Sequence, residues 1–204
     1  WTADDAGVYY SKFPDPQPGK EFTELNKDMK VMYHRMGSEQ SEDRVVYYKP
    51  EHPTWNYGAH VTEDGRYLIL SVFVGTDNKN RVIYQDLSQP ESEMVDLIAN
   101  FESGFGFIDN KGPVFYFHTD KDAPNGRVIA IDIRKPETEN WKEIVAEKPE
   151  CLKRTNIVND TLVCSYFKDV TSQVLLYTLD GEFVREVASP GLGTLSGFGG
   201  KAHD

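Results

Sequence analysis

The sequence predicts an all-β fold: a β-propeller of about four blades, each a four-stranded antiparallel sheet. Two observations favour this fold. Short apolar runs alternate with turns rich in Gly, Asp and Asn, which is typical of antiparallel strands. The same pattern returns at intervals of about 45 to 50 residues, which is typical of repeated propeller blades. Windows with helical apolar spacing are short and interrupted by Gly or Pro, so no helical fold competes.

The pattern is clearest between residues 54 and 87. An Asp64-Gly65 turn precedes an apolar run at 67–74. A polar turn at 75–80 follows, and a second alternating run ends at Leu87. Two such runs separated by turn residues predict a pair of antiparallel strands.

The other expected elements repeat this arrangement along the chain. Upstream, we expect strands at 8–13, 31–35 and 44–49, with a long loop at 14–26. Downstream, we expect strands at 95–99, 101–108, 114–119, 127–133, 141–145, 161–167, 173–179 and 182–187. Asp180-Gly181 is a tight hairpin signal before the last of these. A Gly-rich segment at 193–199 is expected to be the first strand of a further round.

The spacing of equivalent turns gives the blade boundaries. Gly112 follows Gly65 by 47 residues, and its equivalent Thr161 follows by another 49. Gly7 precedes Gly65 by 58, because the loop at 14–26 lengthens the first unit. The expected blades span residues 1–57, 58–105, 106–155 and 156–204. The chain begins without Met and ends on a Gly-rich run, so we expect it to be part of a longer protein.

The charge, the cysteine count and the apolar runs limit the partners and compartments expected for this chain. The formal net charge is −11 and the isoelectric point is about 4.9, which disfavours binding to nucleic acid. Cys151 and Cys164 are too few for a disulfide framework and are expected to be thiols in a reducing compartment. No apolar run approaches the roughly 18 residues of a membrane span.

The residues themselves predict no catalytic site. No Ser lies in the G-x-S-x-G frame of an α/β-hydrolase elbow. The five His residues form no pair with metal-ligand spacing, and no metal or cofactor is expected. The loop at 77–80 could be read as a calcium loop, but turn chemistry explains it better. Asn159-Asp160-Thr161 matches a glycosylation pattern, and a turn between strands is again the preferred interpretation.

Several segments resemble the prolyl oligopeptidases. Residues 36–43, MGSEQSED, are similar to their L-G-T-x-Q-S-E-D segment. Thr54-Trp55, Gly58-Ala59 and DGRYL at 64–68 resemble their W-x-x-G-A-x-x-x-x-D-G-R-Y-L segment. Residues 115–127 are similar to the F-x-F-x-T-N-x-x-A-P-N segment of the next blade. The resemblance covers nearly the whole chain.

The resemblance implies a two-domain cytosolic serine peptidase that cleaves short peptides after proline. In such enzymes a seven-bladed propeller covers an α/β-hydrolase domain and restricts the entry of substrate. This chain would then be an arc of that propeller. The hydrolase domain of the same full-length chain and short proline-containing peptides would be its partners, without nucleic acid or membrane. The catalytic triad would lie outside the chain, which alone is expected to be inactive.

The resemblance also implies candidate site residues. Asn56 occupies a position where relatives carry an apolar residue facing the active-site cavity. Phe73 and Thr76 occupy positions where relatives often carry an Arg and a Cys near the substrate. A mobile loop implicated in gating corresponds to Pro14, Asp15, Pro16, Gln17, Pro18, Gly19 and Lys20. Residues 14–20 could equally be a long hairpin loop without a gating role. Phe73 could equally be a residue that packs within its strand.

Two interpretations of function and one of structure follow. The first function is the substrate-gating domain of a proline-specific serine oligopeptidase. The alternative is a propeller that serves as a non-enzymatic interaction scaffold. Asp64-Gly65-Arg66 is interpreted as architecture, since Gly65 permits a positive φ and Asp64 can accept hydrogen bonds from turn amides.

Overall fold

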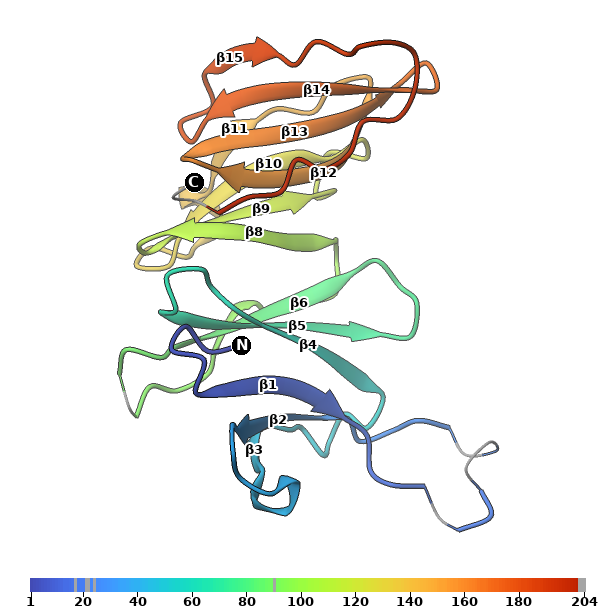
Figure 1. Cartoon of the computed structure of the whole chain (residues 1–204), viewed down its shortest axis with the longest axis vertical. Coiled ribbons are helices and arrows are strands. Elements are labelled where there is room, and N and C mark those ends of the chain that lie inside the picture. Colours follow the sequence, from blue (N-terminus) through green and yellow to red (C-terminus); the bar gives the residue numbers. More distant parts are fainter. Residues whose placement is uncertain (17, 21–22, 24, 90, 202–204) are drawn as a thin grey trace. The chain divides into compact units, whose positions relative to one another are not determined.

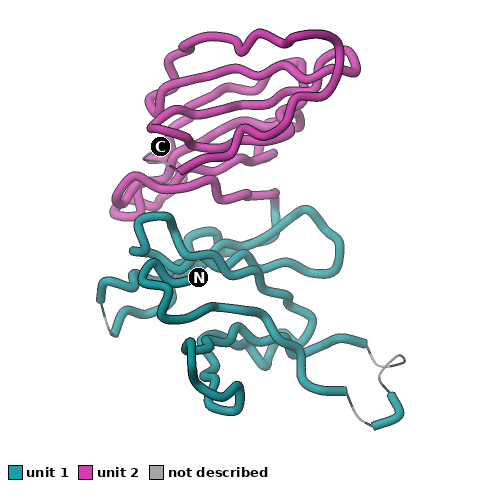
Figure 2. Tube along the Cα trace, in the orientation of Figure 1, with its two compact units in different colours: residues 1–102 teal, residues 103–204 magenta. Residues whose placement is uncertain are grey.

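A computed structural model describes residues 1–16, 18–20, 23, 25–89 and 91–201. The described residues form fifteen β-strands in four antiparallel sheets, with two 3₁₀ turns and no α-helix (Figure 1). The chain divides into two compact units, residues 1–102 and 103–204 (Figure 2). Each unit contains two of the sheets. The prediction of an all-β chain with antiparallel strands is confirmed.

The first unit contains the first and second sheets. The first sheet has the order β1-β2-β3, with a 3₁₀ turn η1 between its last two strands. The second sheet has the order β4-β5-β6-β7. The bounds are β1 Gly7–Lys12, β2 Lys30–Arg35, η1 Gln40–Glu42, β3 Arg44–Tyr47, β4 Trp55–Val61, β5 Tyr67–Val74, β6 Asn80–Asp86 and β7 Val95–Ile98.

The second unit contains the third and fourth sheets. Their strand orders are β8-β9-β10-β11 and β12-β13-β14-β15, so neighbours in sequence are neighbours in space. The bounds are β8 Phe105–Lys111, β9 Val114–Thr119, β10 Arg127–Asp132, η2 Thr138–Asn140, β11 Lys142–Val145, β12 Cys151–Val158, β13 Thr161–Lys168, β14 Thr171–Thr178 and β15 Phe183–Glu186.

Two details of the predicted strands are wrong. Among the described residues, the first sheet has three strands rather than the expected four. Residues 191–201 form no strand. They run along the fourth sheet instead, where Asn156 Nδ2 donates to the Phe198 carbonyl at 2.7 Å. Glycine has low β propensity, so a Gly-rich segment with strand-like spacing gains little from joining a sheet.

The expected blade boundaries stay a prediction, although the sheets begin close to them. β4 begins at Trp55 and β12 at Cys151, each before the boundary expected at 57 or 155. The third sheet begins at Phe105, later than the strand expected from residue 101. Each sheet thus occupies one expected repeat, with edges displaced by a few residues, as is usual for boundaries drawn from pattern.

The same local contacts recur in the second and third sheets, which supports a structural repeat. After β6, Asp86 Oδ1 accepts the Ser88 N–H at 3.0 Å. After β10, Asp132 Oδ1 accepts the Arg134 N–H at the same distance. An arginine near the start of the same strands also pairs with an acid on the outermost strand. These pairs are Arg81–Asp96 at 2.7 Å and Arg127–Glu143 at 3.0 Å.

Each unit has a core between its two sheets. In the first unit, Val31 of β2 packs with apolar side chains of the second sheet, among them Tyr57 and Leu70. In the second unit, Tyr116 of β9 packs with Leu162 and Tyr166 of β13. Burial of one such side chain contributes about 1.5–3 kcal/mol, so sheet-to-sheet packing is the main stabilising contribution.

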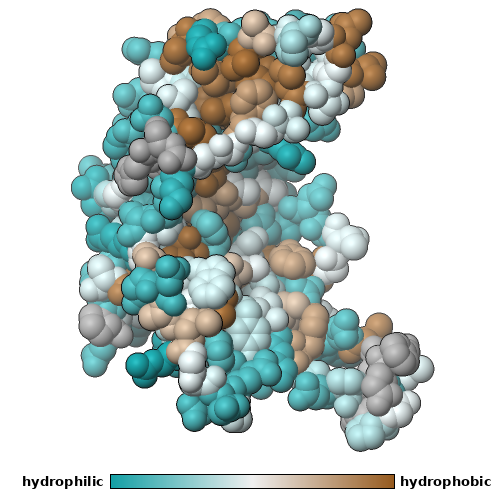
Figure 3. All heavy atoms as spheres, viewed as in Figure 1, coloured by the Kyte–Doolittle hydropathy of each residue, from teal (hydrophilic) through white to brown (hydrophobic). Residues whose placement is uncertain are grey.

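The fourth sheet carries exposed apolar side chains. Figure 3 shows apolar side chains gathered over this sheet. The exposed ones in its strands and turns are Phe167, Val170, Phe183 and Val184. A propeller blade is covered by neighbours on both faces, so exposed apolar area of this kind is typical of a sheet at the end of an arc.

Candidate functional site

Two of the predicted site residues lie directly opposite one another. Asn56 on β4 is the cross-strand partner of Phe73 on β5, and both side chains are half-buried. Asn80 on β6 is the next partner in the same row. Trp55 and Tyr57 point into the core of the first unit. Because successive side chains alternate across a strand, Asn56 and Phe73 project from the opposite face.

Thr76 lies apart from this row. It is exposed in the turn that joins β5 to β6. This turn leaves the sheet at the end where Asn56 and Phe73 lie, since Phe73 is close to the end of β5. Figure 1 shows the β1–β2 connection leaving the first sheet on the same side. The predicted residues therefore share one end of the first unit without forming a single cluster.

The predicted gating loop belongs to the β1–β2 connection, residues 13–29. Pro14, Asp15, Pro16, Pro18, Gly19 and Lys20 are described, whereas Gln17 lies outside the described residues. The entry limb, residues 13–16, and the exit limb, residues 25–28, line a cavity of about 620 Å³. The ion pair between Lys12 and Asp15, at 3.6 Å, is exposed and contributes little stability.

The base of the connection is held by contacts that sequence patterns do not reveal. Ser11 Oγ donates to the Tyr57 carbonyl at 2.6 Å. The Tyr57 N–H donates to the Met29 thioether Sδ at 3.0 Å. Asp28 N–H donates to the Pro53 carbonyl at 2.8 Å, and Asp28 Oδ1 accepts the Tyr48 hydroxyl at 2.8 Å. The residues that flank the connection are thus attached close to Asn56.

Aromatic and cationic side chains surround the start of β4. The His52 ring stacks on the Trp55 ring with centroids 3.9 Å apart. The Arg81 guanidinium lies 4.7 Å from the centre of the Trp55 ring and binds Asp96. Burial raises the pKa of Tyr57 to about 12, which agrees with the place of this side chain in the core. These contacts hold the start of β4 against the core of the first unit.

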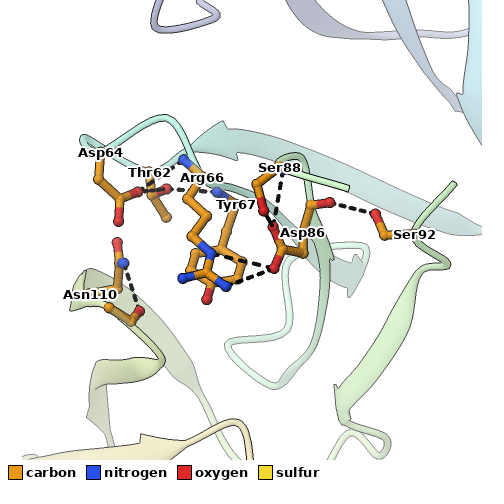
Figure 4. Close-up of polar contacts among 9 residues, drawn as sticks. Thr62, Asp64, Arg66, Tyr67, Asp86, Ser88, Ser92 and Asn110 are labelled. Atoms are coloured by element: carbon orange, nitrogen blue, oxygen red, sulfur yellow. Dashed lines mark hydrogen bonds and ion pairs between the residues drawn. The ribbon is translucent and has the colours of Figure 1, made fainter. Parts of the chain in front are cut away.

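The Asp64-Gly65-Arg66 segment is architectural, as predicted. Gly65 has a φ of +70°, and Asp64 Oδ1 accepts both the Thr62 hydroxyl and the Arg66 N–H. The Arg66 guanidinium binds Asp86 at 3.0 Å (Figure 4). Burial opposes ionisation of Asp86, but hydrogen bonds from Arg66 and Ser88 outweigh it and lower the pKa of that carboxyl. The contacts close the turn between β4 and β5.

The Gln-Ser-Glu-Asp segment has a structural role as well. Asp43 follows the 3₁₀ turn η1, and its carboxylate accepts the Tyr10 hydroxyl at 2.5 Å. The other carboxylate oxygen contacts His34 Nδ1 at 2.7 Å. The hydrogen bond from Tyr10, with a smaller one from His34, lowers the pKa of Asp43. This motif therefore fixes the β2–β3 connection to the first sheet.

The loop at 77–80 and the segment at 159–161 form turns, and the two cysteines are free thiols. Asp77 Oδ1 accepts the Lys79 N–H at 3.0 Å, as in an Asx turn. Asn159 has a φ of +47° in the β12–β13 turn. Cys151 and Cys164 are free thiols. Among the described residues, no three His, Cys, Asp or Glu side chains are grouped to hold a metal ion, and no helix has the length and apolarity to cross a membrane.

A family model and the relatives found by sequence comparison point to the same family. The family model described as "Prolyl oligopeptidase, N-terminal beta-propeller domain" matches residues 1–204. A prolyl endopeptidase of Elizabethkingia miricola is 35% identical over 98% of this chain and 28% of its own length. A dual-function macrocyclase-peptidase of Galerina marginata is 31% identical over 96% of this chain and 27% of its own length. The chain therefore spans about 28% of the length of the first of these relatives.

Solved structures agree with the sequence comparison. Prolyl oligopeptidase B from Galerina marginata, bound to a 35mer hydrolysis and macrocyclization substrate, matches with a TM-score of 0.86 at 29% identity. The match covers 95% of this chain and 27% of that chain. A second match, from a study of two prolyl endopeptidases, has a TM-score of 0.82 at 30% identity. Together with the family model, these matches confirm the predicted β-propeller fold.

Proposed function

Because the chain belongs to the family of prolyl oligopeptidase N-terminal β-propeller domains, we propose that it is the substrate-gating part of a cytosolic serine oligopeptidase. The full-length protein cleaves short peptides after proline. The observation that carries this proposal is the family match over the whole chain, together with relatives named prolyl endopeptidase and prolyl oligopeptidase.

The catalytic groups reside in another part of the full-length protein. The chain corresponds to 27–28% of the length of its relatives. The partner of this chain is accordingly an α/β-hydrolase domain in the same polypeptide, which supplies the serine, aspartate and histidine. The 204-residue chain alone binds or admits peptides and does not hydrolyse them.

The gate lies at the end of the first unit that carries the β1–β2 connection. Asn56 and Phe73 face the peptide substrate, and Thr76 lies at the rim. Their cross-strand pairing and half-burial support this role, because a row that is partly accessible can contact a ligand. An amide and an aromatic ring contact peptides through hydrogen bonds and apolar packing. Thr76 carries no thiol, so alkylation at this position cannot inhibit the enzyme.

The direct test is the activity of the full-length protein on a small proline amide reporter. We expect cleavage after proline, inhibition by a serine-directed reagent, and no cleavage by the 204-residue chain. A full-length protein without the serine, aspartate and histidine, or without post-proline activity, refutes the peptidase function and supports the scaffold alternative.

The site residues are tested separately in the full-length protein. Asn56→Ala and Phe73→Ala are expected to raise KM for peptides several-fold, since each removes a contact worth about 0.5–1.5 kcal/mol. Val95→Ala, an exposed change on β7 of the same sheet, is the control. Equal kinetics for the two site variants and the control contradict a substrate-facing role.

A further inference from the structure

A row of three side chains crosses the first sheet and ends on an arginine. In the strand register, Tyr9 of β1 lies opposite Tyr33 of β2, and Tyr33 lies opposite Arg44 of β3. Val31 precedes Tyr33 by two residues on the same strand, so both side chains point to the same face. Val31 is fully buried in the core of the first unit. The row therefore projects from the face of the first sheet that packs on the second sheet.

An aromatic ring holds the Arg44 guanidinium, but no acid neutralises it. Its central carbon Cζ lies 4.9 Å from the centre of the Tyr33 ring, and the Tyr33 and Tyr9 ring centres are 5.1 Å apart. Among the described residues, no carboxylate lies within ion-pair distance of Arg44. A guanidinium that stacks on a ring keeps the N–H groups in its own plane available to an acceptor.

Arg44 lines a cavity between the first and second sheets of the first unit. The cavity has a volume of about 540 Å³, within the range of about 300–1,000 Å³ that is typical of small-molecule sites. Several of its lining side chains also pack on the core of the first unit, and they are called here the apolar floor. The apolar floor consists of Tyr9, Val46, Val61, Leu87 and Met94.

The N-terminal segment forms one wall of the cavity. Ala3 packs so closely on Gly65, in the β4–β5 turn, that a Cβ at Gly65 would clash with the Ala3 Cβ. Asp4 belongs to the same wall, and its Oδ1 accepts the Ala6 N–H at 3.1 Å. Among the described residues that line the cavity, Arg44 is the one cation and Asp4 is the one acid.

These groups suit a small carboxylate with an apolar body. A guanidinium can donate two parallel N–H groups to one carboxylate, and its weak hydration favours ion pairs in partly buried places. The apolar floor can cover a hydrocarbon body beside that ion pair. The formal net charge of −11 disfavours ligands that carry several negative charges. A ligand with a single carboxylate therefore matches the cavity best.

We propose that this cavity binds small monocarboxylates with an apolar body, with Arg44 holding the carboxylate and the apolar floor covering the body. The cavity is separate from the substrate-facing row proposed above. Val61 is the last residue of β4, whereas Asn56 is close to its first. The proposal does not depend on the peptidase function, because it uses only groups of this chain.

Calorimetric titration of the full-length protein with N-acetyl-leucine tests the ligand class. We expect saturable binding with a millimolar or lower dissociation constant, as the size of this ligand implies. The amide of the same compound lacks the carboxylate, and inorganic phosphate lacks the apolar body. Each is expected to bind about tenfold more weakly or worse. Binding of either probe as tight as that of N-acetyl-leucine overturns the ligand class, and no binding of N-acetyl-leucine overturns the site.

Variants of the full-length protein locate the site. Arg44→Gln is expected to weaken the binding of N-acetyl-leucine about tenfold or more, because a neutral donor replaces a charged one. Arg44→Lys keeps the charge without the paired N–H groups, so an intermediate loss is expected. Asp4→Asn removes the acid from the wall and is expected to strengthen binding up to about fivefold. Arg154→Gln, at an exposed arginine of β12 in the second unit, is the control.

The outcomes keep this proposal apart from the proposed function. Equal binding by the parent and Arg44→Gln, or equal losses in Arg44→Gln and Arg154→Gln, overturns the assignment to this cavity. If Arg44→Gln does not fold, unchanged binding in both Arg44→Lys and Asp4→Asn overturns it. If the full-length protein cleaves no proline peptide but loses binding in Arg44→Gln, the peptidase function fails and this site stands.

Discussion

Replacement of Gly181 by alanine tests how the third and fourth sheets pack within the second unit. Gly181 closes the turn before β15 and has a φ of +92°. A Cβ at this position would lie 2.2 Å from the carbonyl oxygen of Ile144, on β11 of the third sheet. The backbone fixes the position of an alanine Cβ, and the Ile144 oxygen belongs to the backbone, so no rotation of a side chain relieves the clash.

Gly112 provides a matched control in the same unit. It lies in the β8–β9 turn with a φ of +57°, and no atom lies within 4 Å of an added Cβ. A left-handed alanine costs about 1–2 kcal/mol at either position. Forcing two packed backbones apart adds about 1–3 kcal/mol at Gly181 only. The expected loss of unfolding free energy is therefore about 2–5 kcal/mol for Gly181→Ala and about 1–2 kcal/mol for Gly112→Ala.

Urea denaturation of the 204-residue chain measures both variants. With a slope of about 1–3 kcal/mol per molar urea, the extra loss at Gly181 lowers the midpoint clearly below that of Gly112→Ala. If the parent chain unfolds in a clear transition and the midpoint of Gly181→Ala lies below that of Gly112→Ala, the packing of β11 against the β14–β15 turn is supported. Coincident midpoints for the two variants would refute it.

Three further predictions concern stability and reactivity. Leu70→Ala, at a fully buried site, is expected to cost about 2–5 kcal/mol in urea denaturation, whereas Val45→Ala, at a site 51% exposed, should stay within about 0.5 kcal/mol; similar losses would contradict the core assignment. Burial raises the pKa of Cys164 to about 12, so a thiol reagent should modify only Cys151 in the native chain and both thiols in denaturant. Two thiols that react equally fast would be inconsistent with this burial. A hydrogen bond from the Arg134 guanidinium lowers the pKa of Asp132 from 3.8 to about 2. The stabilisation of the folded chain by ionised Asp132 is therefore present above pH 3.8 and is lost as the pH falls through about 2. The stability difference between the parent and Asp132→Asn, at most about 1 kcal/mol for so exposed a pair, should therefore shrink toward pH 2; a difference independent of pH would argue against it.

Most of the strands could be predicted because their sequences carry strong local signals, whereas β4 and β12 were not among the expected strands. The apolar run at 67–74 sits between two turns with Gly and Asp, and β5 occupies the same residues. The segment at 193–199 shows the limit of this reasoning, since Gly spacing imitates a strand without β propensity. In the first sheet the local signals predicted the three strands that form, and the expectation of a fourth came from the repeat rather than from a local signal.

The candidate site depended on different information. Asn56, Phe73 and Thr76 came from the family resemblance, and only the register of β4 and β5 reveals that the first two are opposite one another. The contacts of Ser11 and Met29 with the Tyr57 peptide group had no sequence signal. Ser11 and Met29 lie 46 and 28 residues from Tyr57, and a serine at a strand end or a methionine before a strand is common. Contacts to an open strand edge require the tertiary structure.

We propose that this propeller controls which substrates reach a proline-specific peptidase. The most direct measurement is the rate at which the full-length protein cleaves one proline-containing sequence in two settings, a short peptide and a rigid loop of a folded protein. We predict efficient cleavage of the peptide and resistance of the folded protein. Comparable cleavage of both would contradict gating by the propeller, and cleavage of neither would contradict the peptidase function itself.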